Sequence, residues 1–149
     1  MRKLFIYYSL SGNGDAVADN LKEKGFDICK VEPSKQPPKK FFFRILMYGF
    51  NAGRQYCEPL KPYSCDLDAY DEIVIGSPVW NGRLSCPINT VLSEKDLKNK
   101  KVTFLLYSGS GEAQKAERQI RAAVPDAAIV HLKEPKKNPD VLNKLSDLA

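Results

Sequence analysis

The sequence predicts a single α/β domain built on a doubly wound parallel sheet of five strands in the order 2-1-3-4-5. Short apolar runs alternate with segments of helical spacing along the chain of 149 residues. Parallel strands need crossover connections, and the helices of such connections cover both faces of a sheet. The hydrophobic content of 43% is enough for one packed core, so we expect residues 1–149 to form one domain.

The first half of the chain has the pattern of a strand, a helix and a second strand. Residues 4–8 are a short apolar run, and a Gly/Ser/Asn cluster separates them from a helical pattern that ends at Gly25. Residues 26–31 predict the second strand, which Pro33 prevents from growing further. A helical pattern that is apolar nearly all round predicts a crossover helix over residues 39–54.

The second half of the chain continues this alternation. Residues 72–76 are a continuous apolar run, as expected for a central parallel strand that is buried on both faces. Residues 86–92 predict a helix, with Pro87 near its start. The remaining expected elements are a strand at 101–107, a helix at 112–123, a strand at 127–132 and a closing helix at 140–148, which Asn138 caps and Pro139 begins.

Sorting signals are weak in this sequence. The apolar run after Arg2 and Lys3 stops at Tyr8, short of the roughly 7 to 15 apolar residues of a signal peptide. No window approaches the roughly 20 apolar residues of a membrane span. We therefore expect a soluble, cytoplasmic protein.

The four cysteines are scattered, with no Cys-x-x-Cys pair, and the single histidine, His131, is far from all of them in sequence. This pattern argues against a zinc or iron–sulfur site, and we assign no metal ligands. Without a secretory signal, free buried or half-buried thiols are the expected state of Cys29, Cys57, Cys65 and Cys86.

The net charge of +5 is partly local, because residues 34–57 contain no Asp or Glu. The basic residues of this segment are Lys35, Lys39, Lys40, Arg44 and Arg54. No nucleic-acid-binding module is recognisable, so we expect no nucleic-acid partner. The aromatic run within residues 39–54 could form a docking surface, a lid or a membrane contact. We favour a helix that covers one face of the sheet. Outside this segment we expect no contact with a membrane.

Three loops should meet at one edge of the sheet, because the loops that follow parallel strands emerge on the same side. The first loop comprises Ser9, Leu10, Ser11, Gly12, Asn13 and Gly14. It opens a helix, whose unpaired N–H groups and positive dipole end favour an anion, and its glycines allow a phosphate to approach closely. It is neither a Walker loop nor a G-x-G-x-x-G dinucleotide loop. An ordinary helix start capped by Ser11 or Asn13 is the alternative.

The other two loops are also unusual in composition. The second comprises Ser77, Pro78, Val79, Trp80, Asn81 and Gly82, and the third comprises Tyr107, Ser108, Gly109, Ser110 and Gly111. An aromatic face such as that of Trp80 suits a flat ligand, although a lone tryptophan can simply be core. Asn81 and Gly82 form a turn-prone pair. The third loop, taken alone, could be a second anion-binding helix start.

Residues 9–13 resemble the phosphate loop of the flavodoxin family, Ser/Thr-x-Thr/Ser-Gly-Asn-Thr, with Gly14 in place of the last threonine. Residues 76–80 are similar to the family's Gly-Ser/Thr-Pro-x-aromatic loop. The resemblance implies a short-chain flavodoxin-like domain that binds FMN, with its phosphate on the first loop and Trp80 stacked on the isoalloxazine. It also implies that backbone near Asn81 and Gly82 faces flavin N5, and that the third loop contacts the pyrimidine edge.

This resemblance favours an FMN electron-transfer protein that serves redox protein partners or a small electron acceptor, and has no catalytic residues of its own. The alternative is an FMN-dependent oxidoreductase of the NAD(P)H:quinone type, although no nicotinamide site is recognisable. A flavin-free phosphate-binding or regulatory domain is a third hypothesis, because Gly14 lacks the hydroxyl of the family's threonine. A response-regulator receiver is disfavoured, since the third strand ends in Gly76 and Ser77 rather than in a phosphoacceptor aspartate. The basic net charge differs from that of the acidic electron-carrier flavodoxins and predicts a different redox partner or a less negative reduction potential of the flavin. Arg83 is the basic residue that we expect nearest the flavin ring.

Overall fold

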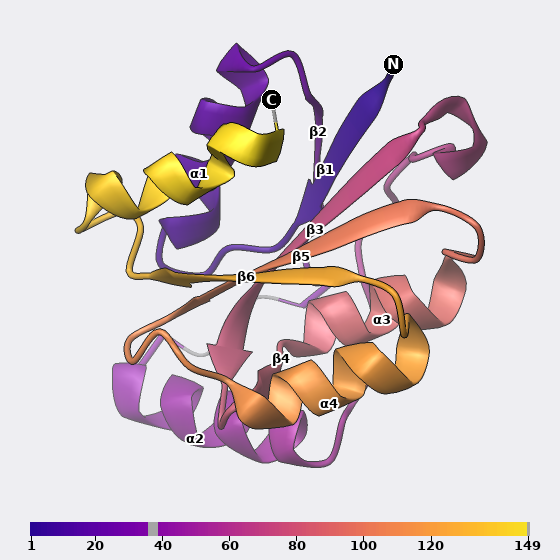
Figure 1. The fold of residues 1–149 in the computed structure, drawn as a ribbon. Coiled ribbons are helices and arrows are strands. Elements are labelled where there is room, and N and C mark those ends of the chain that lie inside the picture. Colours follow the sequence, from indigo (N-terminus) through magenta and orange to yellow (C-terminus); the bar gives the residue numbers. More distant parts are fainter. Residues whose placement is uncertain (36–38, 149) are drawn as a thin grey trace.

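The computed structural model describes residues 1–35 and 39–148. Its centre is a parallel sheet with the strand order β2-β1-β3-β5-β6 (Figure 1). The parallel strands are β1 (Lys3–Tyr7), β2 (Asp27–Lys30), β3 (Glu72–Trp80), β5 (Lys101–Ser108) and β6 (Ala128–Lys133). Counted along the chain, these strands confirm the predicted order 2-1-3-4-5.

One additional strand was not predicted. The two-residue strand β4 (Arg83–Leu84) pairs antiparallel with the end of β3. Asn81 and Gly82 connect the two strands, and both have positive φ angles, of 51° and 72°. A two-residue hairpin turn with this geometry is typical of an Asn-Gly pair. Strand β3 therefore extends past Gly76, where the apolar run ends, to Trp80.

The helices agree with the sequence except at η1 (Leu67–Ala69), a short 3₁₀-helix that was not predicted, and at the end of the chain. They are α1 (Asn13–Glu23), α2 (Phe41–Gly53), α3 (Cys86–Glu94) and α4 (Gln114–Ala123). The closing segment η2 (Pro139–Leu148) is a 3₁₀-helix rather than the expected α-helix. It buries Leu145 and Leu148, whose spacing of three residues suits the 3₁₀ repeat. The Asn138 side chain donates to the Lys133 carbonyl at 3.2 Å, which directs it back toward β6.

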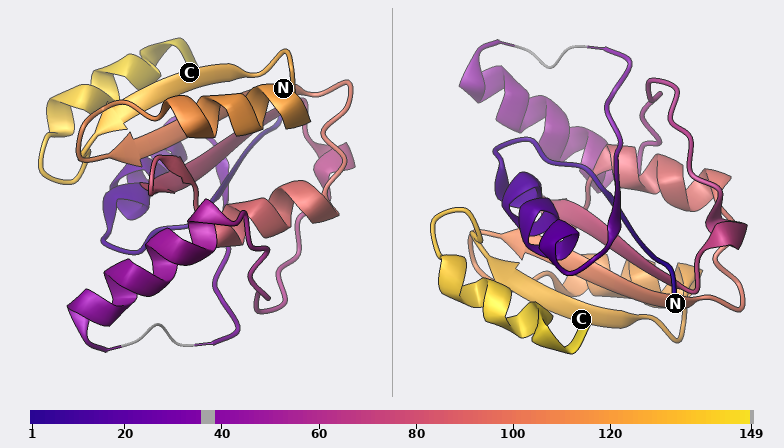
Figure 2. Two further views of the ribbon diagram at one scale, coloured as in Figure 1. Left: turned by 90° about the horizontal axis from the view of Figure 1, so that it is seen from below. Right: turned by 90° about the horizontal axis from the view of Figure 1, so that it is seen from above.

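Helices cover both faces of the sheet, with α1 and η2 on one face and α3 and α4 on the other (Figures 1 and 2). Neighbouring residues of a strand enter different cores: Phe5 packs beneath α1 and η2, whereas Ile6 packs in the core on the opposite face. Both side chains are fully buried. This two-sided burial explains why the strands are continuous apolar runs without alternation.

The prediction of free thiols is wrong for two of the four cysteines. Cys29 in β2 and Cys65 in the segment before β3 form a disulfide across a sequence separation of 36 residues. Cys57 and Cys86 are free, the first exposed and the second buried. Burial raises the pKa of the Cys86 thiol to about 12, so this thiol is not a nucleophile at neutral pH. The disulfide was not predictable because only the packing of the edge strand brings its two sulfurs together.

No helix in the described ranges has the length and apolar character needed to cross a bilayer.

Candidate functional site

The first loop holds two N–H groups of the α1 terminus on a single oxygen. The Ser9 Oγ accepts hydrogen bonds from the backbone N–H of Gly12 and of Gly14, each at 3.1 Å. Gly12 is the N-cap residue of α1 with a φ of 95°, and the Ser9 hydroxyl caps the first turn. The capping residue is therefore Ser9 and not Ser11 or Asn13, as the alternative predicted. Both N–H groups have the Ser9 oxygen as their partner here, so an anion at this helix N-terminus would take the place of that side chain.

Gly14 lies where no side chain fits. A Cβ at this position would stand 2.6 Å from the Tyr107 hydroxyl and 2.8 Å from Cδ2 of Tyr7. The ring of Tyr107 is buried in β5, and its hydroxyl donates to the Tyr8 carbonyl. Glycine is thus required by packing under the loop, which explains the departure from the threonine of the similar family motif.

Lys136 lies against this loop and was missed by the sequence analysis. It belongs to the connection between β6 and η2, and its backbone N–H donates to the Asn13 Oδ1 at 3.1 Å. Its Nζ donates to the Ser11 carbonyl at 3.4 Å and would be 3.2 Å from a Cβ on Gly12. A cation therefore accompanies the N–H groups of the loop. In the sequence, Lys136 is one of two adjacent lysines between a predicted strand and a predicted helix, and nothing in this pattern indicates that either lysine reaches the first loop.

Asp15 places a carboxylate in the first turn of α1 and is held away from the loop by two partners. It accepts from the Tyr7 hydroxyl at 2.7 Å and from the Lys30 Nζ at 2.9 Å. Burial alone would raise the pKa of Asp15, but the hydrogen bonds from Lys30 and Tyr7 outweigh it and lower the pKa. Burial and the Asp15 hydrogen bond raise the pKa of Tyr7. The carboxylate stays ionised while its charge is compensated by Lys30.

Trp80 ends β3 close to the first loop, but one face of its ring is already covered. Tyr48 of α2 stacks on it with ring centroids 4.3 Å apart and an interplanar angle of 3°. Tyr8 meets the indole edge-on at 5.6 Å. Trp80 is 9% exposed, so its ring offers no open face to a flat ligand while Tyr48 is stacked on it, and the stacking that the family resemblance implies requires Tyr48 to move.

A cavity of about 680 Å³ connects the first loop, the second loop and helix α2. The predicted residues that line it are Leu10, Ser11, Val79, Trp80 and Asn81. Helix α2 supplies the others, which are Arg44, Leu46, Tyr48, Gly49 and Phe50. This volume falls within the roughly 300–1,000 Å³ of small-molecule sites. The contribution of α2 was not predicted, because helical spacing does not show which loops a crossover helix will contact.

The rest of the second loop is held in the framework. Ser77 is fully buried, lies 2.9 Å from the Ser85 hydroxyl and accepts from the Ser85 N–H at 3.1 Å. Pro78 is half-buried. In the turn, the Asn81 carbonyl accepts from Arg83 Nη1 at 3.3 Å, and the Gly82 carbonyl accepts from the Ala116 N–H at 2.9 Å. Both carbonyls of the turn therefore have donors from the protein.

The third loop does not reach this cavity. Ser108 Oγ accepts from the Gly111 N–H at 2.9 Å, Ser110 Oγ accepts from the Glu112 N–H at 3.2 Å, and Gly109 is exposed. With Tyr107 buried, no residue from 107 to 111 lines the cavity in the described part of the chain. The structure thus joins two of the three predicted loops.

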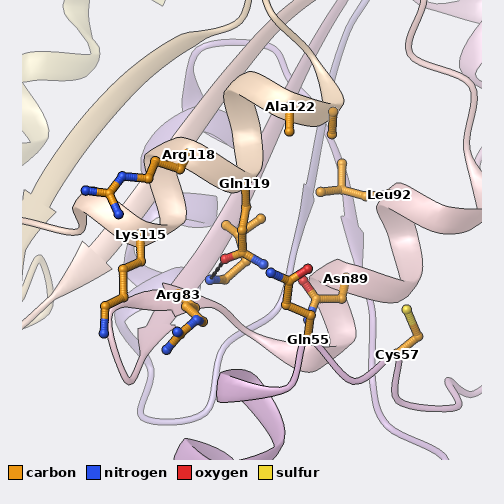
Figure 3. A pocket seen from close by; sticks show the side chains of 11 residues that line it. Gln55, Cys57, Arg83, Asn89, Leu92, Lys115, Arg118, Gln119 and Ala122 are labelled. Carbon is orange, nitrogen blue, oxygen red and sulfur yellow. Dashed lines mark hydrogen bonds between the residues drawn. The ribbon is translucent and has the colours of Figure 1, made fainter.

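A second cleft of about 590 Å³ lies on the other side of the β3–β4 turn, between α3 and α4 (Figure 3). Three cations, Arg83, Lys115 and Arg118, gather along one side of it (Figure 3). Its polar lining otherwise consists of the carboxamides of Gln55, Asn89 and Gln119. Within the described ranges, no carboxylate forms an ion pair with any of the three cations. The region beside the turn is therefore electropositive.

The fold and the site together define a doubly wound α/β domain with an anion-binding loop between β1 and α1, at the point where the strand order reverses. A sequence model described as flavodoxin matches residues 59–144, which is more than half of the chain. The chain belongs to the flavodoxin family.

Solved structures agree with this fold. The crystal structure of a flavoprotein from Lactobacillus acidophilus NCFM in complex with FMN has a TM-score of 0.72 at 20% identity, covering 93% of this chain and 97% of that chain. The NMR structure of the apo-form of the flavoprotein from the same organism has a TM-score of 0.63 at 20% identity, with coverages of 89% and 90%. Oxidised Flavodoxin 2 from Bacillus cereus has a TM-score of 0.50 at 20% identity, with coverages of 99% and 94%. No curated protein matches the chain.

Proposed function

We propose that this protein binds FMN and acts as an electron-transfer flavoprotein. The observation that carries the proposal is the convergence of the Gly12 and Gly14 N–H groups on the Ser9 oxygen, at a helix start beside a cavity that Trp80 lines. Membership of the flavodoxin family and the similarity to a flavoprotein crystallised with FMN support the same cofactor. The residues fit FMN, because an anion site for its phosphate and an aromatic wall for its ring border one cavity.

Each part of the site has a separate task. Bound FMN supplies reversible uptake of electrons. The N–H groups of Gly12 and Gly14 would bind the phosphate in place of the Ser9 oxygen that they contact here, and Lys136 adds a positive charge over the same loop. Trp80 and Tyr48 keep water away from one side of the cavity. The two loops therefore divide the work between anchoring the phosphate and enclosing the ring.

The electropositive cleft indicates which partners suit an electron carrier of this kind. Arg83, Lys115 and Arg118 lie next to the turn that follows Trp80, and none of the described residues that line their cleft is acidic. A partner protein with an acidic surface would be attracted to this side of the molecule, and the attraction would weaken as salt is added. This charge distribution favours an acidic redox partner over a basic one.

A second candidate function is an FMN-dependent NAD(P)H reductase that passes electrons to a quinone or a similar acceptor. The cleft of about 590 Å³ is the feature that favours it, since three cations and three carboxamides suit the phosphates of a dinucleotide. Purified protein that oxidises NADPH with a quinone acceptor would support this function. In that case Arg118→Glu should raise KM for NADPH with little effect on FMN binding.

The primary test is a titration of the cofactor-free protein with FMN, followed by equilibrium dialysis. We expect saturable binding with one FMN per chain, a perturbed flavin absorbance spectrum and reversible reduction of the bound flavin. If FMN does not associate with the folded protein, the redox function is rejected and the flavin-free phosphate-binding domain becomes the better hypothesis.

A further inference from the structure

Helix α2 presents large apolar side chains to solvent instead of burying them. The exposed fractions are 67% for Phe42, 56% for Phe43, 54% for Leu46, 38% for Met47 and 69% for Phe50. These residues share one face through their spacing of three and four positions. The opposite face buries Tyr48 and Ala52. The prediction that residues 39–54 simply cover the sheet is therefore incomplete, because in the described part of the chain the helix has a second apolar face that stays exposed, and Leu46 and Phe50 of that face also border the cavity.

Basic residues border this exposed face at both ends of the helix. Lys39 and Lys40 are exposed at its start, and Lys40 Nζ lies 5.9 Å from the ring centre of Phe43. Arg54 follows its end and lies 5.3 Å from the ring of Phe50 and 5.1 Å from that of Tyr56. No Asp or Glu occurs between residues 34 and 57. A helix that lies in an anionic membrane surface needs apolar side chains that insert between the lipid chains. It also needs basic side chains that stay at the level of the lipid headgroups.

We propose that α2 is a membrane-docking helix and that its partner is the surface of an anionic phospholipid bilayer. The helix lies at the periphery of the molecule, away from α1 and η2, so its outer face can approach a flat surface (Figure 2). Two copies of the chain paired through this face would bring their basic ends together with no carboxylate in the segment to compensate them. An anionic lipid surface compensates these charges over the whole length of the helix.

The same helix connects docking to the cofactor cavity. Leu46 and Phe50 belong both to the exposed face and to the lining of the cavity beside Trp80. Docking through α2 therefore places the mouth of that cavity at the lipid surface. Apolar electron acceptors dissolved in the bilayer would then be within reach of the site.

Co-sedimentation with vesicles tests the proposal. We expect the FMN-free and the FMN-loaded protein to bind phosphatidylglycerol vesicles, and to bind phosphatidylcholine vesicles much more weakly. The variant Phe42→Ser/Phe43→Ser/Phe50→Ser should lose binding, while its unfolding transition stays unchanged because all three rings are exposed. Lys39→Gln/Lys40→Gln should weaken the partition about 25-fold, since each basic residue near an anionic surface contributes about fivefold.

A matched control removes the same number of charges elsewhere. Lys22→Gln/Lys98→Gln changes two exposed lysines outside α2, and it should bind like the unchanged protein. Absence of binding to phosphatidylglycerol vesicles, or equal binding by the triple serine variant, overturns the proposal. A vesicle-free dimer that the triple serine variant dissociates would show that a second copy covers this face and would overturn it as well. Because the FMN-free protein is also tested, failure of the cofactor assignment does not decide the result for docking.

Discussion

Gly14 and Tyr107 compete for one position beneath the phosphate loop. A Cβ on Gly14 would stand 2.6 Å from the Tyr107 hydroxyl, which donates instead to the Tyr8 carbonyl. The side-chain hydroxyl that similar loops offer at this position is absent, and the Tyr107 hydroxyl occupies its space. The packing of Tyr107 therefore accounts for the departure from the family motif at Gly14.

Gly14→Thr should destabilise the protein without improving FMN binding. Overpacking of this kind costs about 1–3 kcal/mol, which exceeds the roughly 1 kcal/mol that an added hydroxyl could contribute through a hydrogen bond. Urea unfolding and FMN titration measure the two effects. Tyr107→Phe should relieve part of the collision, so the double variant should cost less than the sum of the single variants. Unchanged stability of Gly14→Thr would contradict the contact.

Lys136→Gln should weaken FMN binding but leave riboflavin binding unchanged. Riboflavin lacks the phosphate, and the Lys136 Nζ lies over the loop that we assign to the phosphate. Loss of a charge-assisted contact corresponds to about 1.5–3 kcal/mol, or roughly 10- to 150-fold in Kd. Lys137→Gln is the matched control, because that side chain is 77% exposed and pairs with Glu134. An equal loss of affinity for FMN and for riboflavin would contradict the phosphate contact, and would mean that Lys136 contacts the flavin ring or stabilises the fold instead.

The features that the sequence predicted are those set by local pattern. The run at residues 72–76 predicted a central strand because its apolar side chains must be covered on both faces. The first loop was recognisable because glycine and hydroxyl residues between a strand and a helix favour an anion site. Asn81 and Gly82 predicted a turn from their tolerance of positive φ, and both have it. The alternation of elements predicted a parallel sheet, and the strand order is the one that five strands suit in a doubly wound fold.

The features that the sequence did not predict are contacts between distant segments. Tyr48 stacks on Trp80, Lys136 reaches the first loop, and Cys29 bonds to Cys65, each across more than 30 residues. These contacts depend on how the segments between helices and strands pack, and those segments have no periodic sequence pattern from which their packing could be predicted. The apolar pattern of α2 was visible, but the same pattern is expected of a helix buried all round and of one with an unpartnered face. Only the three-dimensional structure separates these two cases.

Arg83→Glu should lower the reduction potential of the bound flavin. Arg83 donates to the Asn81 carbonyl at 3.3 Å and lies in the electropositive cleft beside the turn. Reduction adds negative charge to the ring, so exchange of a cation for an anion disfavours it, by roughly 1 kcal/mol or some tens of millivolts at a solvated site. Lys98→Glu makes the same change in charge outside this cleft and should leave the potential nearly unchanged. If the reduction potential does not fall in Arg83→Glu, the charge of Arg83 does not influence the reduction of the flavin.

Asp15→Asn should remove part of the acid sensitivity of the fold. The pKa of Asp15 is lowered in the folded protein, because hydrogen bonds from Lys30 and Tyr7 outweigh the effect of burial. A lowered folded pKa contributes stability above the unfolded value of about 3.9, and this stability is lost as pH falls through the folded pKa. The wild-type protein should therefore exceed the variant in stability near neutral pH, with the difference shrinking below about pH 4. Asp126→Asn, at an exposed carboxylate after α4, is the control, and chemical unfolding across pH is the measurement.

Trp80→Leu should weaken FMN and riboflavin equally, in contrast to Lys136→Gln. The indole borders the cavity, and stacking contributes about 0.5–1.5 kcal/mol beyond burial, or roughly 2- to 12-fold in Kd. Because Trp80 is the single tryptophan, its fluorescence in the unchanged protein should fall as FMN binds. The indole is nearly buried against Tyr48, so the variant is compared below its unfolding transition. If saturating FMN leaves the Trp80 fluorescence unchanged, the flavin ring does not bind next to Trp80. Comparison of FMN with riboflavin separates the residues that bind the phosphate from the residues that enclose the flavin ring.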